Sequence, residues 1–207
     1  MIPLDIFADP VCPWCLIGKL ELDRALESRP LHPFQIAWHP FRLNPQMPRA
    51  GMDRIDYLHA KLGPRAEEAS RAVAERAAVL GLNLNPSPRE PDTTDAHRLM
   101  HWVGLEGAQT RVMSGLLRAH WQEARDIGDA GELARIAAAA GMDADMVGRL
   151  LSSDADRDEV VARENHARER GISSVPTFIV ANQHAISGTQ PASLWQQVID
   201  ELAPISK

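Results

Sequence analysis

The stretch LDIFADPVCPWC, residues 4–15, decides the fold of this chain. Its apolar beginning predicts a strand over residues 4–8, and Asp9-Pro10 ends that strand. A Cys-x-x-Cys pair follows at the start of a helical pattern, with Pro13 in the first turn, where a helix tolerates proline. Two thiols three positions apart at a helix start can reach each other. The stretch therefore favours reversible disulfide chemistry.

The remaining pattern predicts two β-containing parts separated by helices. A second strand is expected at 34–39, a hairpin at 177–187 and a final helix from Pro191, so the order is βαβ…ββα in the α/β class. Asp129, Asp143 and Ser153 are the expected N-caps of three helices between these parts. The two β parts must pair, because neither is a stable sheet alone. We therefore predict one domain from 1–50 and 172–207, and a large all-helical insertion or cap over 51–171, which includes the return helix.

Composition excludes several classes of partner. The net charge of −6 disfavours nucleic acids and anionic membranes, which both select basic surfaces. No apolar run approaches the length of a membrane span, and the N-terminus has no signal-peptide pattern. We therefore expect a cytoplasmic protein. In a reducing cytosol the cysteine pair is expected to be redox-active or metal-binding, since stable disulfides are rare there.

Cys12 and Cys15 are the only cysteines. The unpaired N–H groups of a helix N-terminus favour an anion, so we expect Cys12 to be the more exposed nucleophile and Cys15 the resolving thiol. A zinc site needs two further ligands with suitable spacing, and no histidine pair stands beside the motif, so no metal is expected. An incidental pair of core cysteines is the remaining alternative.

The run SSVPT, residues 173–177, precedes an apolar strand. A proline there is compatible with a plain edge-strand start. With a Cys-x-x-Cys present, we expect instead a cis-proline loop at Pro176 that packs against the thiols. Val175 and Thr177 flank this proline, and the Val175 backbone would pair with an extended substrate.

Together these features resemble the DsbA-like thioredoxin superfamily, and more narrowly its FrnE-type branch. That branch is related to 2-hydroxychromene-2-carboxylate isomerases and kappa-class glutathione transferases. The resemblance covers nearly the whole chain and rests on the CPWC motif and on three further segments: WHPFRLNP at 38–45, DTTDAHRL at 92–99 and ISGTQP at 186–191. It implies a thioredoxin fold. Asp92 departs from the asparagine of the family pattern, and the extra C-terminal cysteine pair of some FrnE-type proteins is absent.

Further candidate substrate-binding residues follow from their positions in the sequence, and Thr189, Gln190 and His97 each have a plainer alternative. Trp14 lies between the thiols and is expected to offer an exposed apolar contact. Thr189 and Gln190 precede a helix start that would bind a carboxylate of glutathione, or would simply cap the helix. His97 is expected to face the active cleft, or to be a hydrogen-bonded interface histidine.

Two acidic positions and one charged run complete the candidates. Asp5 and Asp9 lie on or just after the first strand, and one of them would accept a proton from Cys15 if it faces inward, as a buried carboxylate does in thioredoxins. The sequence does not show which one does. The run RENHARER, residues 163–170, has the composition of a solvated helix face.

The sequence thus predicts a thiol–disulfide oxidoreductase or isomerase with no bound cofactor. Its substrates would be disulfide-containing proteins or small thiol compounds. With one cysteine pair it needs an external reductant, glutathione or a thioredoxin-like protein, and glutathione is also a candidate cosubstrate. The alternatives are a glutathione-dependent isomerase or transferase of a small aromatic substrate, a chaperone-like binding module, and a metal-binding dimer. A homodimer is compatible with the sequence.

Overall fold

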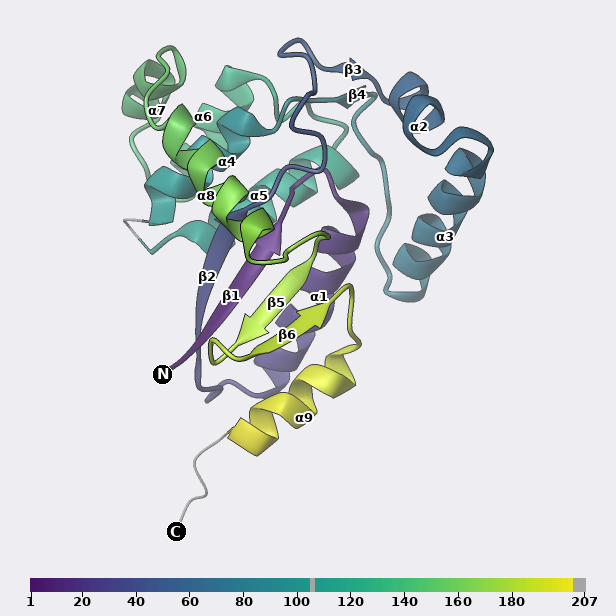
Figure 1. Ribbon diagram of the computed structural model, residues 1–207, viewed down its shortest axis with the longest axis vertical. Coiled ribbons are helices and arrows are strands. Elements are labelled where there is room, and N and C mark those ends of the chain that lie inside the picture. Colours follow the sequence, from purple (N-terminus) through teal and green to yellow (C-terminus); the bar gives the residue numbers. More distant parts are fainter. Residues whose placement is uncertain (105–106, 203–207) are drawn as a thin grey trace.

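The sheet at the centre of the protein has four strands. The computed structural model describes residues 1–104 and 107–202. The strands lie in the order β2-β1-β5-β6, namely β2 (Phe34–Pro40), β1 (Ile2–Ala8), β5 (Thr177–Val180) and β6 (His184–Ser187). β1 runs parallel to β2 and antiparallel to β5, which runs antiparallel to β6. The two ends of the chain therefore build one mixed sheet, as predicted (Figure 1).

The alternation of side chains along β1 gives the sheet two different faces. Ile6 is opposite Phe178 of β5, and Phe178 packs edge-on against Trp195, with ring centroids 4.8 Å apart. This apolar face is covered by α1 (Pro13–Ser28) and α9 (Ala192–Leu202). Asp5 and Phe7 point to the other face, which α8 (Arg157–Glu169) crosses (Figure 1). The strand that leads into the cysteines is thus covered on both sides.

The segment between β2 and β5 forms a cap at one end of the sheet (Figure 1). A short 3₁₀ helix, Gly63–Arg65, joins its first two helices, and these two stand apart from the others. The helices are α2 (Arg54–Leu62), α3 (Ala66–Val79), α4 (Thr94–Gly104), α5 (Gln109–Gln122), α6 (Ala130–Ala139), α7 (Ala144–Leu151) and α8.

The insertion is not all-helical, in contrast to the prediction. β3 (Met52–Asp53) and β4 (Arg89–Glu90) pair antiparallel and form a second, two-stranded sheet. The backbone N–H of Arg54 continues this pairing to the carbonyl of Pro88, at 2.9 Å. Strands of two residues are too short to leave an alternating pattern, so sequence periodicity cannot show them.

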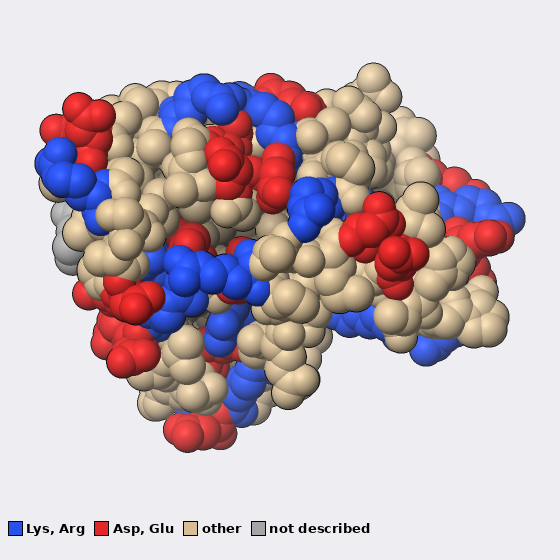
Figure 2. Space-filling model, turned by 90° about the horizontal axis from the view of Figure 1, so that it is seen from above, with Lys and Arg blue, Asp and Glu red and all other residues tan. Residues whose placement is uncertain are grey.

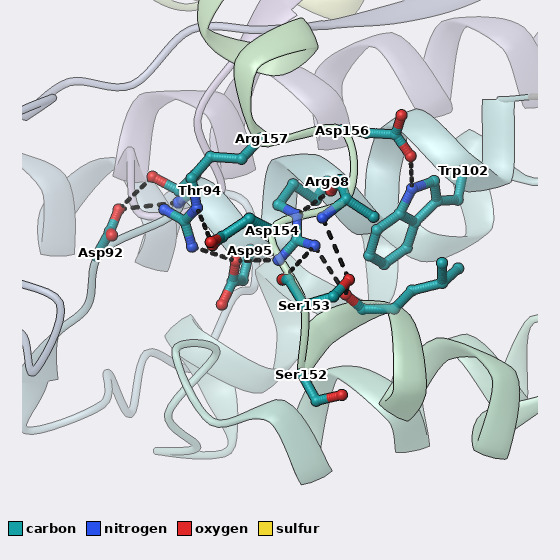
Figure 3. A network of polar contacts seen from close by, with 12 residues as sticks. Asp92, Thr94, Asp95, Arg98, Trp102, Ser152, Ser153, Asp154, Asp156 and Arg157 are labelled. Atoms are coloured by element: carbon teal, nitrogen blue, oxygen red, sulfur yellow. Dashed lines mark hydrogen bonds and ion pairs between the residues drawn. The ribbon is translucent and has the colours of Figure 1, made fainter.

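The beginning of α8 also differs from the prediction that Ser153 caps it. The helix begins at Arg157, and the Ser153 hydroxyl accepts a hydrogen bond from the N–H of Ala155 at 3.2 Å. The buried guanidinium of Arg98 donates to the carbonyls of Leu150, Ser153 and Ala155, at 2.7–2.9 Å (Figure 3). A side chain of α4 thus forms hydrogen bonds with the backbone carbonyls of the turn between α7 and α8.

Tryptophans bond the cap to the sheet domain. Trp38 of β2 donates from its indole to the hydroxyl of Thr110, at 3.0 Å, and from its backbone to the amide oxygen of Gln109, at 2.9 Å. Trp121 of α5 donates to the carbonyl of Pro10, at 3.0 Å. Because Pro10 precedes the cysteines by two positions, a cap residue helps to fix the cysteine loop.

The surface seen from above the cap carries charges of both signs. Lysine and arginine side chains alternate there with aspartate and glutamate, so this face is not dominated by one sign (Figure 2). Within the described residues, every helix is too short or too polar to cross a bilayer.

Candidate active site

The cysteine motif forms the first turn of α1. Cys12 is the N-cap residue, with extended backbone angles (φ −82°, ψ 117°), and Pro13 is the first helical residue. The Cys12 N–H donates to the carbonyl of Asp9, at 2.9 Å, and the Cys15 N–H donates to the carbonyl of Cys12, at 3.0 Å. No side chain caps the helix, and Pro13 has no N–H. The Trp14 N–H and the positive end of the helix dipole therefore remain to stabilise a thiolate on Cys12.

Both thiols are free and both are buried. Cys12 is 3% exposed and Cys15 is 2% exposed, so the expectation that Cys12 is clearly the more exposed one is not met. The difference between them is electrostatic. Burial, followed by the hydrogen bond and the negative charge of Cys12, raises the pKa of Cys15 well above its usual range. Cys15 therefore keeps its proton more firmly than an ordinary thiol does.

The predicted cis-proline loop faces Cys12. The Val175–Pro176 peptide bond is cis, and the Cys12 thiol donates to the carbonyl of Val175, with 3.6 Å between sulfur and oxygen. The Thr177 hydroxyl is turned inward and donates to the carbonyl of Ser174, at 2.7 Å. The loop and the thiol are 163 residues apart in the chain, and the β1–β5 pairing brings them together.

The other predicted binding residues lie close to this loop, but some of their polar atoms are already bonded. Trp14 is 38% exposed, and its carbonyl accepts a hydrogen bond from the Thr189 hydroxyl at 3.0 Å. The Gln190 amide donates to the carbonyl of Ser187, at 3.1 Å. At the start of α9, the N–H of Ala192 donates to a carboxylate oxygen of Glu21, at 2.9 Å. The carboxylate of Glu21 thus already occupies the helix start at which a ligand carboxylate was expected to bind.

His97 lies beneath the cysteine loop and is only 2% exposed. Its Nε2 is 3.6 Å from Oδ1 of Asp9, which is also buried. Neither of these atoms has a hydrogen-bond partner among the described residues, whereas Oδ2 of Asp9 accepts from the N–H of Leu43 at 2.7 Å. His97 therefore faces a buried carboxylate instead of the open surface, and its predicted substrate contact stays a prediction.

The position of Asp9 answers the question of which acidic residue faces inward. Asp9 is close enough to Cys15 for both its backbone and its charge to affect the pKa of that thiol. Asp5 lies on the opposite face of the sheet, where its carboxylate bonds to Nε2 of His39 at 2.6 Å. Of the two candidates, Asp9 is thus the acidic residue that faces inward, toward Cys15.

Sequence reasoning missed further buried ionisable groups near Asp9. Burial, with the charge of Asp9, raises the pKa of Glu90 to about 7, although Arg54 pairs with this carboxylate at 2.6 Å. Burial lowers the pKa of His120 to about 3, and raises the pKa of Tyr57. These groups come from β4, α5 and α2, so no local motif links them.

The fold and the site together define a class of protein. A Cys-x-x-Cys pair at the start of α1, opposite a cis-proline loop on a mixed four-stranded sheet, is the arrangement of a thioredoxin-fold dithiol protein. The chain belongs to the family of the DSBA-like thioredoxin domain, whose model matches residues 3–200.

Solved structures with the same fold cover nearly the entire chain. A probable DsbA oxidoreductase from Streptomyces coelicolor, SCO1869, is 27% identical, with a TM-score of 0.85 over 100% of this chain and 94% of its own. A 2-hydroxychromene-2-carboxylate isomerase is 15% identical, with a TM-score of 0.71 over 97% and 95%. The cytosolic disulfide reductase DsbM from Pseudomonas aeruginosa with GSH is 16% identical, with a TM-score of 0.70 over 96% and 98%. The predicted kinship with both oxidoreductases and isomerases is confirmed for the fold.

Proposed function

We propose that the protein is a thiol–disulfide oxidoreductase that uses Cys12 as nucleophile and Cys15 as resolving thiol. The observation that carries the proposal is the position of Cys12, which is the N-cap residue of α1 and whose sulfur lies 3.6 Å from the carbonyl oxygen of Val175 beside the cis-proline. A substrate disulfide that enters this loop reaches one sulfur at a helix N-terminus. A thiolate on that sulfur would be stabilised by the positive end of the helix dipole.

The reaction proceeds by two exchanges. The Cys12 thiolate attacks one sulfur of the substrate disulfide, the substrate S–S bond breaks, and the other substrate sulfur leaves as a thiolate. Cys15 then loses its proton and attacks the Cys12 sulfur, which releases the second substrate thiolate and leaves a Cys12–Cys15 disulfide. In the mixed disulfide the negative charge of Cys12 is gone. One of the causes that raise the Cys15 pKa is therefore removed when Cys15 must react.

Regeneration of the dithiol needs an external reductant, since the chain has no further cysteine. Two glutathione molecules would reduce the Cys12–Cys15 disulfide and leave as glutathione disulfide; a thioredoxin-like dithiol would do the same in one encounter. The DsbM likeness supports glutathione and a cytoplasmic setting, because that fold neighbour is described as a cytosolic disulfide reductase with GSH. The substrate would be a protein or a small disulfide.

The test compares the two cysteines in the same assay. Cys12→Ser should abolish reduction of insulin or glutathione disulfide. Cys15→Ser should form a mixed disulfide on Cys12 that persists, and mass spectrometry should detect it as an added substrate mass. Full activity of Cys12→Ser, or trapping on Cys15 instead of Cys12, would contradict the proposal.

The fold likeness to the isomerase favours one second candidate, a glutathione-dependent isomerase or transferase. That function requires saturable glutathione binding that survives Cys15→Ser and weakens with Gln190→Ala. Glu21 of α1 argues against this function, because its carboxylate already accepts from the N–H of Ala192 at the start of α9, where a glutathione carboxylate would bind. Client protection by a Cys12→Ser/Cys15→Ser double variant would instead indicate a chaperone-like module.

A further inference from the structure

A cavity of about 570 Å³ lies on the face of the sheet away from α1. The sheet provides Phe7, His39 and Ile179 to its wall, α8 provides Arg163, and Arg170 follows directly after α8. The cysteines and Pro176 do not line it. The segment expected to be a solvated helix face therefore contributes one side to a cavity that is separate from the dithiol site. Its volume is in the range of small-molecule sites.

The hydrogen bonds fix the protonation state of the histidine in this wall. Nδ1 of His39 is 3.3 Å from a guanidinium nitrogen of Arg163, and Nε2 is 2.6 Å from a carboxylate oxygen of Asp5. Arginine only donates, so Nδ1 accepts and the proton is on Nε2, which donates to Asp5. His39 is thus neutral, in agreement with its pKa, which burial and then the charge of Arg163 lower against the opposing effect of Asp5.

Arg163 therefore keeps a positive charge that its neighbours do not neutralise. Its two terminal nitrogens donate to Nδ1 of His39 and to Nδ1 of His101, the latter at 3.1 Å. Neither Arg163 nor Arg170 forms an ion pair with a carboxylate in the part of the chain that the structure describes. A guanidinium has five N–H donors, so Arg163 has donors left for a bound anion. The cavity wall is cationic although the whole chain is acidic.

Part of the wall is apolar and carries a stacked pair of rings. The ring of Phe7 stacks on His39, with centroids 4.9 Å apart and planes inclined by 22°. Ile172 and Ile179 complete this side of the cavity. Planar apolar groups pack well against such a surface. The ligand therefore needs a flat hydrophobic body and one negatively charged end.

We propose that this cavity binds a small aromatic carboxylate. The carboxylate would accept from Arg163, with which it forms a charge-assisted pair, and the ring would lie along Phe7. Asp5 lies on the same wall and its charge is not removed by neutral His39, so a singly charged carboxylate fits better than a doubly charged phosphate. This inference does not depend on the proposed thiol chemistry, because the two sites share no residue.

Naphthoate is a suitable probe, because its own fluorescence reports its binding to the purified full chain. We expect saturable binding, and weaker binding of the uncharged naphthalene methanol. Arg163→Gln keeps polar hydrogens but removes the charge, and it should weaken naphthoate binding about tenfold or more, as expected for a hydrogen bond to a charged group. Arg71 is exposed on α3, and Arg71→Gln is the matched control, which should leave binding unchanged.

A second variant tests the location without altering a charge. Ala162 lines the cavity and is exposed, so Ala162→Trp should fill the space and abolish binding while circular dichroism shows an intact fold. Disulfide reduction by Cys12 and Cys15 should continue in both variants. The proposal is overturned if naphthoate does not bind saturably, if the alcohol binds equally well, or if Ala162→Trp and Arg163→Gln both bind like the wild type.

Discussion

At the scale of single residues, the buried Asp9 carboxylate is the feature with the clearest chemical consequence. One of its oxygens accepts from the N–H of Leu43, and the other faces His97 without a hydrogen bond. A buried oxygen without a hydrogen bond costs free energy, and a role in proton transfer would explain this cost. We expect Asp9 to take the proton that Cys15 loses when it attacks the mixed disulfide.

Asp9→Asn tests this role, because an amide oxygen still accepts from Leu43 while the proton acceptor is lost. Resolution of a mixed disulfide on Cys12 should slow about a hundredfold near neutral pH, the low end of general acid–base contributions. The rate should also rise with pH, as hydroxide replaces the carboxylate. Rapid quenching followed by mass spectrometry measures the lifetime of the mixed disulfide.

Asp5→Asn is the matched control for Asp9→Asn. Asp5 is in β1, the strand that leads into the cysteines, but its side chain lies on the face of the sheet away from them. Its loss should therefore not change the lifetime of the mixed disulfide. Resolution by Asp9→Asn at the wild-type rate would remove Asp9 from the mechanism.

At the scale of elements, the approach of α1 to the cis-proline loop is the tightest contact of the site. A Cβ added at Gly18 would lie 3.1 Å from Cγ of Pro176 and 3.5 Å from the ring of Phe178. Contacts this short are rare for a real Cβ, and the neighbour must move to admit one. Glycine at this position lets the helix that carries the cysteines lie directly against the loop.

Gly18→Ala should therefore destabilise the protein even though alanine favours helix. Overpacking costs about 1–3 kcal/mol, which exceeds the propensity gain of about 1 kcal/mol. The matched control is Gly148→Ala in α7, where an added Cβ meets nothing within 4 Å and should stabilise. Urea unfolding compares both with the wild type. Equal stabilisation by the two variants would contradict this prediction and would show that Pro176 moves aside at little cost.

The elements show which parts of the fold could be predicted from sequence. β1, α1 and β5 carry strong local patterns, and the Val175–Pro176 loop has a recognisable sequence, so these were predicted with nearly correct bounds. The two strands β3 and β4 were missed because two residues carry no period. The cap predicted at Ser153 was wrong because Ser153 belongs to the turn after α7, which Arg98 of a distant helix holds, and α8 begins only at Arg157.

The candidate site divides in the same way. Cys12, Cys15 and Pro176 are visible in local sequence, and the structure brings them together. The neighbours of Asp9 are not visible, because His97 and Glu90 reach it from separate cap elements and only the folded chain brings them close. The sequence left open whether His97 faces the active cleft or is a hydrogen-bonded interface histidine. The structure buries it against Asp9, and its contact with substrate stays a prediction.

At the scale of the whole molecule, the ionisable groups buried in the cap make stability depend on pH. The pKa of Glu90 is raised from 4.5 to about 7, so between these values the folded protein keeps a proton that the unfolded chain has lost. This contribution to the free energy of unfolding is present below pH 4.5 and falls by about 3 kcal/mol as pH rises through 7. His120 acts oppositely. Its pKa is lowered from 6.5 to about 3, so its contribution is lost as pH falls through that range.

Glu90→Gln isolates one of these effects. The stability of this variant relative to the wild type should increase by about 3 kcal/mol from about pH 4 to about pH 8, because glutamine has no charge to bury. Denaturant unfolding at several pH values measures the difference. The exposed Glu75→Gln on α3 is the control and should show a constant difference. A constant difference for Glu90→Gln as well would contradict the raised pKa.

The pairing of β1 with β5 has a consequence for how the protein emerges from the ribosome. Residues 4–7 are hydrogen-bonded to residues 177–180, so the central strand has no antiparallel neighbour until most of the chain has been synthesised. Pairing over such a separation is slow compared with local helix formation. During translation the two thiols are therefore exposed on a nascent chain whose cap helices can already form. The dithiol site is therefore complete only after residues 175–180 have been synthesised and have paired with β1.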